Sequence, residues 1–200
     1  MRLQEQAEQL ERLATKANFF YLRSWAAFHQ GWIVGLQGNY TESARRIRKV
    51  IDDWRAERTY LLTPRMLERL AVTYARLDRL DQAAGTLDEA LCAAVQRGET
   101  YFLAELIRMK GEFLLAQGGA AEDVAVHYRD AAALAARQGS RMLELRALTS
   151  LCALWQAAGS QDELAAARRA LQANYDRFTE GFSGYDLTAA RTQLAESAAR

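Results

Sequence analysis

The sequence predicts an all-α protein: a right-handed superhelix of about four helix pairs of roughly forty residues each, with flanking helices. Three observations support this fold class. Alanine, leucine, arginine, glutamate and glutamine dominate the 200 residues, and all five are strong helix formers. The chain holds a single proline, Pro64. Small residues, apolar residues and turn residues recur along the chain at a nearly constant spacing.

The repeat is clearest at four alanines that are 40, 41 and 40 residues apart: Ala44, Ala84, Ala125 and Ala165. Six residues before each alanine stands a turn residue: Gly38, Asp78, Gly119 and Gly159. This pattern predicts a helix A, a short turn and a helix B, with the alanine where the two helices cross. Each pair has apolar residues on more than one face, so the pairs are expected to stack on one another.

The first two expected helices span residues 3–17 and 19–37. The first has no helix before it, so residues 1–17 are interpreted as the end of a preceding repeat and the chain as a piece of a longer protein. The second covers most of an uncharged stretch, residues 24–41. A bilayer would leave the polar groups of this stretch unsatisfied, so it predicts a buried helix of a water-soluble protein. Those polar residues are His29, Gln30, Gln37 and Asn39.

Further helices are expected at 41–56, 64–77, 80–97, 100–117, 121–138, 141–158, 161–178 and 187–198. Thr63 and Pro64 are typical of an N-cap and a first helical turn, and Gly98 and Gly139 of helix C-termini. Asp186 is expected to cap the last helix. One repeat domain over 1–200 results, with repeats at 18–57, 58–98, 99–139 and 140–178 and a C-terminal turn and capping helix at 179–200.

Charge and cysteine content restrict the class of protein. A net charge of +1 gives no overall reason to expect direct binding to nucleic acid or to a membrane. Cys92 and Cys152 lie in apolar stretches without a CxxC motif, so small buried thiols in a reducing cytosol are expected, with one disulfide as the alternative. The first dozen residues lack the apolar run of a secretory signal. A cytoplasmic protein is therefore predicted.

Several short segments carry a resemblance to a known family. They are residues 31–38, 87–91, 104–108, 111–115, 143–147, 150–151 and 154–155. The most specific is the ending Phe178-Thr179-Glu180-Gly181-Phe182, followed by Asp186-Leu187 and Ala190. The chain resembles the C-terminal TPR-like region of large bacterial regulators. In these regulators a class III adenylate or guanylate cyclase domain, or a DNA-binding transcriptional domain, precedes a STAND-type predictive ATPase module and helical repeats.

The resemblance covers nearly the whole chain and has two departures. The family usually has an aromatic residue where this chain has Arg177, and Asp-Thr-Pro or a similar run where it has Ser183-Gly184-Tyr185. Both bear on the local turn geometry. The resemblance implies a TPR-like solenoid with a regulatory or scaffolding role in signal transduction. It implies no cyclase or ATPase activity for this chain, because those domains lie upstream in the family.

The residues that could carry chemistry do not form a recognisable site. Nothing matches a P-loop. His127 has Asp123 four residues before it and Asp130 three after, which is compatible with a metal but lacks a cysteine or a second histidine. A surface histidine beside acids is the ordinary interpretation. No catalytic residue, cofactor-binding residue, cofactor or metal site is predicted.

Two further motifs are interpreted as structural. The basic run at 45–49 is followed by Asp52 and Asp53, four residues beyond Arg48 and Lys49, so a partly neutralised, solvated helix face is expected. Binding of nucleic acid or an acidic partner is the alternative. Gly31 and Gly35 form a GxxxG pair, which predicts close packing of helix A on helix B rather than membrane dimerisation.

An aromatic stripe offers the sharpest functional candidate. Tyr21, Trp25, Phe28 and Trp32 recur at spacings of four, three and four, so they share one face of a helix. Packing against neighbouring helices is one interpretation. The other is an exposed contact for an upstream domain or a partner, where aromatic residues contribute much of the binding energy.

The predicted function is a non-catalytic scaffold. It would bind protein, either upstream domains of the same polypeptide or a separate partner, on a concave surface formed mainly by the A helices. The residues expected on that surface are Tyr101, Glu105, Arg108 and Arg146. The alternative function is sensing of a small-molecule inducer in an ATPase-linked regulator. A homodimer is left open, and an enzyme is the least favoured class.

Overall fold

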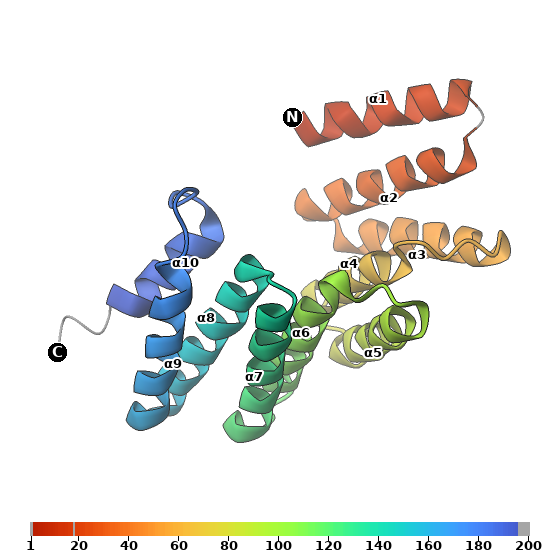
Figure 1. Cartoon of the computed structure of the whole chain (residues 1–200). Helices are drawn as coiled ribbons and strands as arrows, with labels where there is room; N and C mark the ends of the chain where they lie inside the picture. The colour runs from red at the N-terminus through yellow and green to blue at the C-terminus, as the bar shows by residue number, and fades with distance from the viewer. Residues whose placement is uncertain (1, 18, 196–200) are drawn as a thin grey trace. The chain divides into compact units, whose positions relative to one another are not determined.

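The computed structural model describes residues 2–17 and 19–195, and every regular element within them is helical (Figure 1). The first half of the chain contains α1 (Arg2–Lys16), α2 (Phe20–Leu36), α3 (Tyr40–Ala56), α4 (Thr63–Arg76) and α5 (Leu80–Arg97). The second half contains the 3₁₀ turn η1 (Thr100–Phe102) and α6 (Leu103–Ala116), α7 (Ala121–Arg137), α8 (Arg141–Ala158), α9 (Gln161–Tyr175) and α10 (Tyr185–Ala195). The predicted all-α fold of helix pairs is confirmed.

The chain divides into two compact units, Met1–Glu99 and Thr100–Arg200. In unit 1, α2 pairs with α3 and α4 with α5, while α1 packs on α2 and α3 on α4. In unit 2, α6 pairs with α7 and α8 with α9, and α10 packs on both α8 and α9. The A helices are therefore α2 and α4 in unit 1 and α6 and α8 in unit 2. None of the described helices has both the length and the apolar character needed to cross a bilayer.

Each unit has an apolar core between its helices. In unit 1 the largest fully buried side chains include Trp54, Ile47 and Leu70. In unit 2 a single cluster joins Tyr128, Trp155 and Leu171 to Leu187 of α10. Burying a large apolar side chain contributes about 1.5–3 kcal/mol, so these residues stabilise the pairing that periodicity alone predicted. Cys152 is buried as expected, but Cys92 is exposed, which corrects that part of the prediction.

The four predicted crossing alanines occupy the same position in their B helices, but only two of them are buried. Each is the fifth residue of its B helix. Ala44 and Ala125 are buried, Ala84 is half-buried and Ala165 is exposed. Two repeat positions are buried in all four helices. One lies a residue before the alanines (Ser43, Ala83, Val124 and Leu164), and the other lies six residues after them (Val50, Ala90, Ala131 and Leu171). The packed side of each B helix therefore includes the residue before the alanine, because a helix turns each successive side chain by about 100°.

Glycines of the A helices let the B helix approach closely in two of the four pairs, α2–α3 and α6–α7. A Cβ atom on Gly35 would lie 2.8 Å from Oγ of Ser43, and one on Gly111 would lie 2.7 Å from Cε1 of Tyr128. Gly31 is similarly close to Ile47, at 3.2 Å. The GxxxG prediction of close packing between helices A and B is confirmed.

Most helices end in the same backbone motif. At the end of α2 the amide of Asn39 donates to the carbonyl of Val34 across 3.1 Å while Gly38 has a positive φ, as in a Schellman cap. The same arrangement recurs at Gly98, Gly139 and Gly159, as expected, and at Asp78, which has a φ of 58°. At the end of α6 the positive φ belongs to Gly118, the residue before the turn glycine Gly119 that the repeat spacing identified.

Two predicted caps are wrong. Thr63 is the first residue of α4, and its hydroxyl donates to the carbonyl of Tyr60 at 2.6 Å instead of accepting from a helix amide. Asp186 lies inside the first turn of α10, where it pairs with Arg146. Helix α9 ends at Tyr175 and α10 begins at Tyr185, each a few residues from expectation, and residues 196–198 lie outside the described part of the chain.

Candidate functional site: the exposed faces of the A helices

A half-exposed stripe runs along both A helices of unit 1. On each helix its members are spaced by four, three and four residues, so they share one face. On α2 they are Trp25, His29, Trp32 and Leu36, and on α4 they are Arg65, Arg69, Val72 and Arg76. The two sets match position by position, 40 residues apart, and none of the eight residues is buried. We call these eight residues the unit 1 A-face.

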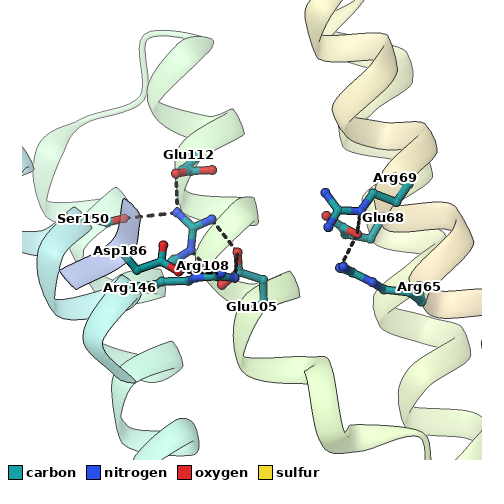
Figure 2. A network of polar contacts seen from close by, with 9 residues as sticks. All are labelled: Arg65, Glu68, Arg69, Glu105, Arg108, Glu112, Arg146, Ser150 and Asp186. Carbon is teal, nitrogen blue, oxygen red and sulfur yellow. Dashed lines mark hydrogen bonds and ion pairs between the residues drawn. The ribbon is translucent and has the colours of Figure 1, made fainter. Parts of the chain in front are cut away.

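Two of the three arginines of the unit 1 A-face, Arg65 and Arg69, converge on one buried carboxylate. Nη1 of Arg65 donates to Oε2 of Glu68 at 2.7 Å, and Nε of Arg69 lies 3.3 Å from the same oxygen (Figure 2). Only 3% of Glu68 is exposed. The guanidinium of Arg69 also lies 4.4 Å from the ring centroid of Trp32, a cation–π contact that joins α4 to α2. Two cations thus share one anion beside an aromatic ring.

The aromatic residues of α2 support one another. Trp25 stacks on Phe28 with ring centroids 5.1 Å apart, and His29 meets Trp25 edge-on at 4.8 Å. Burial, followed by the charges of Arg65 and Arg69, lowers the pKa of His29 below its usual 6.5. The imidazole is therefore mainly neutral at pH 7, and His29 adds no positive charge to this face.

The four residues of the predicted aromatic stripe separate into two environments. Phe28 is only 3% exposed and belongs to the core. Tyr21, Trp25 and Trp32 are half-buried, and Tyr21 packs on Trp54 with ring centroids 5.2 Å apart. Packing accounts for Phe28, while a partner contact stays a prediction for the other three.

In unit 2 the A helices carry a network of ion pairs centred on Arg108 (Figure 2). Its Nε and Nη2 atoms donate to the two oxygens of Glu105 at 3.0 and 2.7 Å. Its Nη1 atom donates to Glu112 and, at 3.2 Å, to Oγ of Ser150 on α8. The side chains of Glu105 and Arg108 are only 8% and 12% exposed. The network therefore fastens α6 to α8 in a largely dry environment.

The network continues from α8 to α10. Nη1 of Arg146 lies 3.6 Å from Oε1 of Glu105, and its Nη2 atom donates to Oδ2 of Asp186 at 2.8 Å. Burial lowers the pKa of Arg108, but the hydrogen bonds and charges of Glu105 and Glu112 outweigh it, so the pKa is raised overall. Every charged residue of this network is thus paired within unit 2.

The structure brings together three of the four surface residues predicted in unit 2. Glu105, Arg108 and Arg146 belong to the network. Tyr101 is 56% exposed on η1 and packs on Phe102, with ring centroids 6.3 Å apart. The residues that sequence reasoning missed are Glu112, Ser150, Asp186 and the arginines of the unit 1 A-face. Applying the forty-residue spacing to the A helices, as was done for the crossing alanines, would have identified them.

Other sequence candidates have ordinary surroundings. Among the described residues no group of three or more His, Cys, Asp or Glu side chains is arranged to hold a metal ion. In the basic run, Arg45 and Arg46 both bond Glu42, which lowers the pKa of Glu42 to about 2. Lys49 pairs with Asp53 as expected, at 2.7 Å. Asp52 accepts from Arg55 at 3.2 Å, which corrects its predicted pairing with Arg48.

Known structures show the same fold. The crystal structure of BtubC (BKLC) from P. vanneervenii matches 98% of this chain and 89% of its own, with a TM-score of 0.74 and 15% identity. The TPR-like repeats of a kinesin light chain-like protein from Podosopora anserina match 90% of both chains, with a TM-score of 0.63 and 15% identity. A variant of the latter matches 86% of both chains, with a TM-score of 0.64 and 16% identity.

Sequence comparisons give no closer assignment. No protein-family model matches the chain, and no curated protein matches it significantly. The structural likeness therefore rests on shape, and it assigns the chain a TPR-like helical-repeat fold.

Proposed function

We propose that this chain is a non-catalytic scaffold whose A helices bind a segment of another protein or of an upstream domain of the same polypeptide. The observation that carries the proposal is the unit 1 A-face, where half-exposed tryptophans lie beside arginines on two adjacent helices. Tryptophan and arginine are among the residues that contribute most to protein–protein binding energy. The TPR-like fold supports the proposal, because such repeats generally mediate protein interactions.

The regulatory context is the finer part of the proposal. Following the sequence resemblance, the scaffold would act in the cytoplasm of a bacterium and relay regulation to a STAND-type ATPase and an output domain. In this arrangement the chain holds the partner, and any cyclase or ATPase chemistry lies in upstream domains. A repeat scaffold suits this role, because helix pairs that stack through their cores transmit a displacement as rigid bodies.

Peptide display with hydrogen-exchange mapping tests the proposal. A random peptide library is selected on the full chain, and the exchange of backbone amides is compared with and without the best binder. The proposal expects slower exchange in the A helices, α2, α4, α6 and α8, with little change in the B helices. Failure to select any binder, or protection confined to α3, α5, α7 and α9, would contradict it. Small organic acids are screened in the same assay to test the alternative of a small-molecule inducer. If a small acid binds more tightly than every selected peptide, the proposal of a protein-binding scaffold is contradicted.

A further inference from the structure

Helix α10 has the register of an A helix. Asp186 stands 40 residues after Arg146 of α8, which itself stands 41 residues after Glu105 of α6. The residue that follows this position is buried in every A helix and in α10: Ala26, Met66, Leu106, Ala147 and Leu187. Helix α10 also packs on the preceding pair, α8 and α9, as α8 packs on α6 and α7. By sequence and by packing, α10 is therefore the A helix of a further repeat.

The side of α10 that would meet a B helix is exposed. In complete pairs this side includes the position of Gly31 and Gly111, which lie against α3 and α7, and the position seven residues earlier on the same face. Both positions are buried in all four A helices: Gly31, Ala71, Gly111 and Cys152 at the first, and Ser24, Pro64, Ala104 and Leu145 at the second. In α10 they hold Thr192, which is exposed, and Tyr185, which is 86% exposed. Within the described residues α10 therefore has no B helix.

Helix α1 is the converse, a B helix whose A helix is missing from the described residues. Ala7 is buried, as is Ile47, the B-helix residue 40 positions further on. Leu10 is only half-buried, and Leu13 is 60% exposed. The counterparts of Leu10 are buried in all four complete pairs: Val50, Ala90, Ala131 and Leu171. Leu10 and Leu13 thus mark the side of α1 on which an A helix would pack.

From these two open sides we infer that copies of this chain associate head to tail, with α10 of one copy packing as the A helix on α1 of the next. The contact continues the A–B pairing that the chain already forms four times. A head-to-tail contact leaves one α1 and one α10 open, so association can proceed beyond two copies. The inference is independent of the proposed function, because it concerns the B-helix side of α10 and not the exposed faces of the A helices.

The side-chain sizes of α10 and α1 suit each other. In the α6–α7 pair a small A-helix residue faces a large B-helix residue, because a Cβ atom on Gly111 would lie 2.7 Å from Cε1 of Tyr128. At the matching positions α10 has Thr192 and α1 has Ala7, so the larger residue is on the A helix. A threonine would overpack a tyrosine or an isoleucine, but it fits opposite an alanine. This exchange of sizes favours α1 as the helix that α10 meets.

Sedimentation velocity on the full chain tests the association. One helix pair is a small interface, so the mean mass is expected to rise from that of one copy at about 5 μM to that of two or more copies at about 500 μM. The mass of a single copy over this whole range would overturn the inference.

Two variants each block one side of the contact. Leu13→Lys alters α1 and Thr192→Arg alters α10, and both should fold because both residues are exposed. Each variant alone is expected to remain a single copy at the higher concentration. Their equimolar mixture should form a dimer and stop there, since it retains one intact α10 and one intact α1. Val95→Lys, at an exposed apolar residue of α5, is the control and should associate like the unchanged chain.

The variants also separate this contact from other modes of association. If either variant alone associates as strongly as the unchanged chain, or if the mixture forms no dimer, the inference is overturned. Loss of association in Leu13→Lys but not in Thr192→Arg would indicate that two α1 helices pair, which also overturns it. A chain that stays a single copy while selected peptides protect its A helices would leave the proposed function in place.

Discussion

Nη2 of Arg146 lies 2.8 Å from Oδ2 of Asp186, so a charge-assisted hydrogen bond joins α8 to α10. On its other side the same guanidinium lies 3.6 Å from Glu105 of α6. Glu105, Arg146 and Asp186 occupy one repeat position, 41 and 40 residues apart, and the sign of the charge reverses at each step. If the charge kept alternating from one A helix to the next, the A helix after α8 would carry an acid at this position. Asp186 of α10 provides that acid.

The Arg146–Asp186 pair predicts how firmly α10 is held. Asp186→Asn removes the charge and keeps the side-chain volume, so α10 should open more often. Because 35% and 24% of the two side chains are exposed, we expect a cost of about 0.5–1 kcal/mol. Hydrogen exchange of the α10 amides should accelerate accordingly. Asp130→Asn, at an exposed position of α7, is the control, and an equal acceleration in α10 by this control would contradict the prediction.

The Glu105–Arg108 pair is predicted to stabilise unit 2 more than a surface pair does. Glu105→Gln removes the negative charge of one partner of the largely buried Arg108 guanidinium. Urea denaturation should show that the free energy of unfolding falls by about 2 kcal/mol. The control is Arg129–Glu163, a pair at 2.7 Å whose side chains are 44% and 50% exposed. Glu163→Gln should cost at most about 0.5 kcal/mol. Equal losses would show that burial does not strengthen the pair at Glu105.

Two glycines should respond to alanine with opposite signs. A Cβ atom at Gly111 would meet the Tyr128 ring at 2.7 Å, so Gly111→Ala should destabilise unit 2 by about 1–3 kcal/mol. At Gly85, inside α5, the new methyl group would find open space, so Gly85→Ala should stabilise by about 0.5–1 kcal/mol. Urea denaturation measures both. A loss at Gly85 or a gain at Gly111 would contradict the packing described for these helices.

The two cysteines should differ in reactivity. Burial raises the pKa of Cys152 to about 11, so very little thiolate forms there at pH 8, whereas Cys92 is exposed. Treating the folded chain with a thiol reagent should give one fast and one slow reaction, and Cys92→Ser should remove the fast one. The pKa of Cys152 is raised in the folded state, so the folded chain favours the neutral thiol. The contribution of this thiol to the free energy of unfolding is fully present below pH 9 and is lost as the pH rises towards 11.

His29 predicts a loss of stability in mild acid. Its pKa is lowered in the folded state by burial and by Arg65 and Arg69, while Glu68 is the carboxylate bonded to both arginines. Because the folded state disfavours the protonated imidazole, the contribution of His29 to the free energy of unfolding is fully present above the unfolded pKa of 6.5. It falls at lower pH, where the unfolded chain binds the proton more readily than the folded chain does. The free energy of unfolding, measured by urea titration from pH 7.5 to pH 5, should fall less in His29→Gln. Identical pH profiles would refute this assignment.

The order and length of the helices were predictable because periodicity and turn residues are local signals. The Schellman ends at Gly98 and Gly139 follow directly from glycine at positions that need a positive φ. The position that is buried in every B helix was misassigned by one residue, because small residues stand side by side there in several of these helices. Which of Ala83 and Ala84 faces helix A is decided by packing between helices, and only the structure shows it.

The candidate site was predictable in part. The aromatic spacing identified Trp25 and Trp32, and the repeat placed Glu105, Arg108 and Arg146 on A helices. That Phe28 turns into the core depends on how α2 sits against its neighbours, which the spacing of one helix does not reveal. The pairing of Arg69 with Trp32 joins residues 37 positions apart on different helices, so it follows from tertiary packing rather than from a local pattern.

The most direct test of the unit 1 A-face as a binding surface is a two-dimensional NMR titration that follows the four tryptophan indole N–H signals. Trp25 and Trp32 lie on the unit 1 A-face, whereas Trp54 and Trp155 are each 1% exposed and lie in the two cores. Adding the best peptide selected from the library should shift the signals of Trp25 and Trp32 and leave those of Trp54 and Trp155 in place. Saturable binding that leaves Trp25 and Trp32 unmoved would contradict the account.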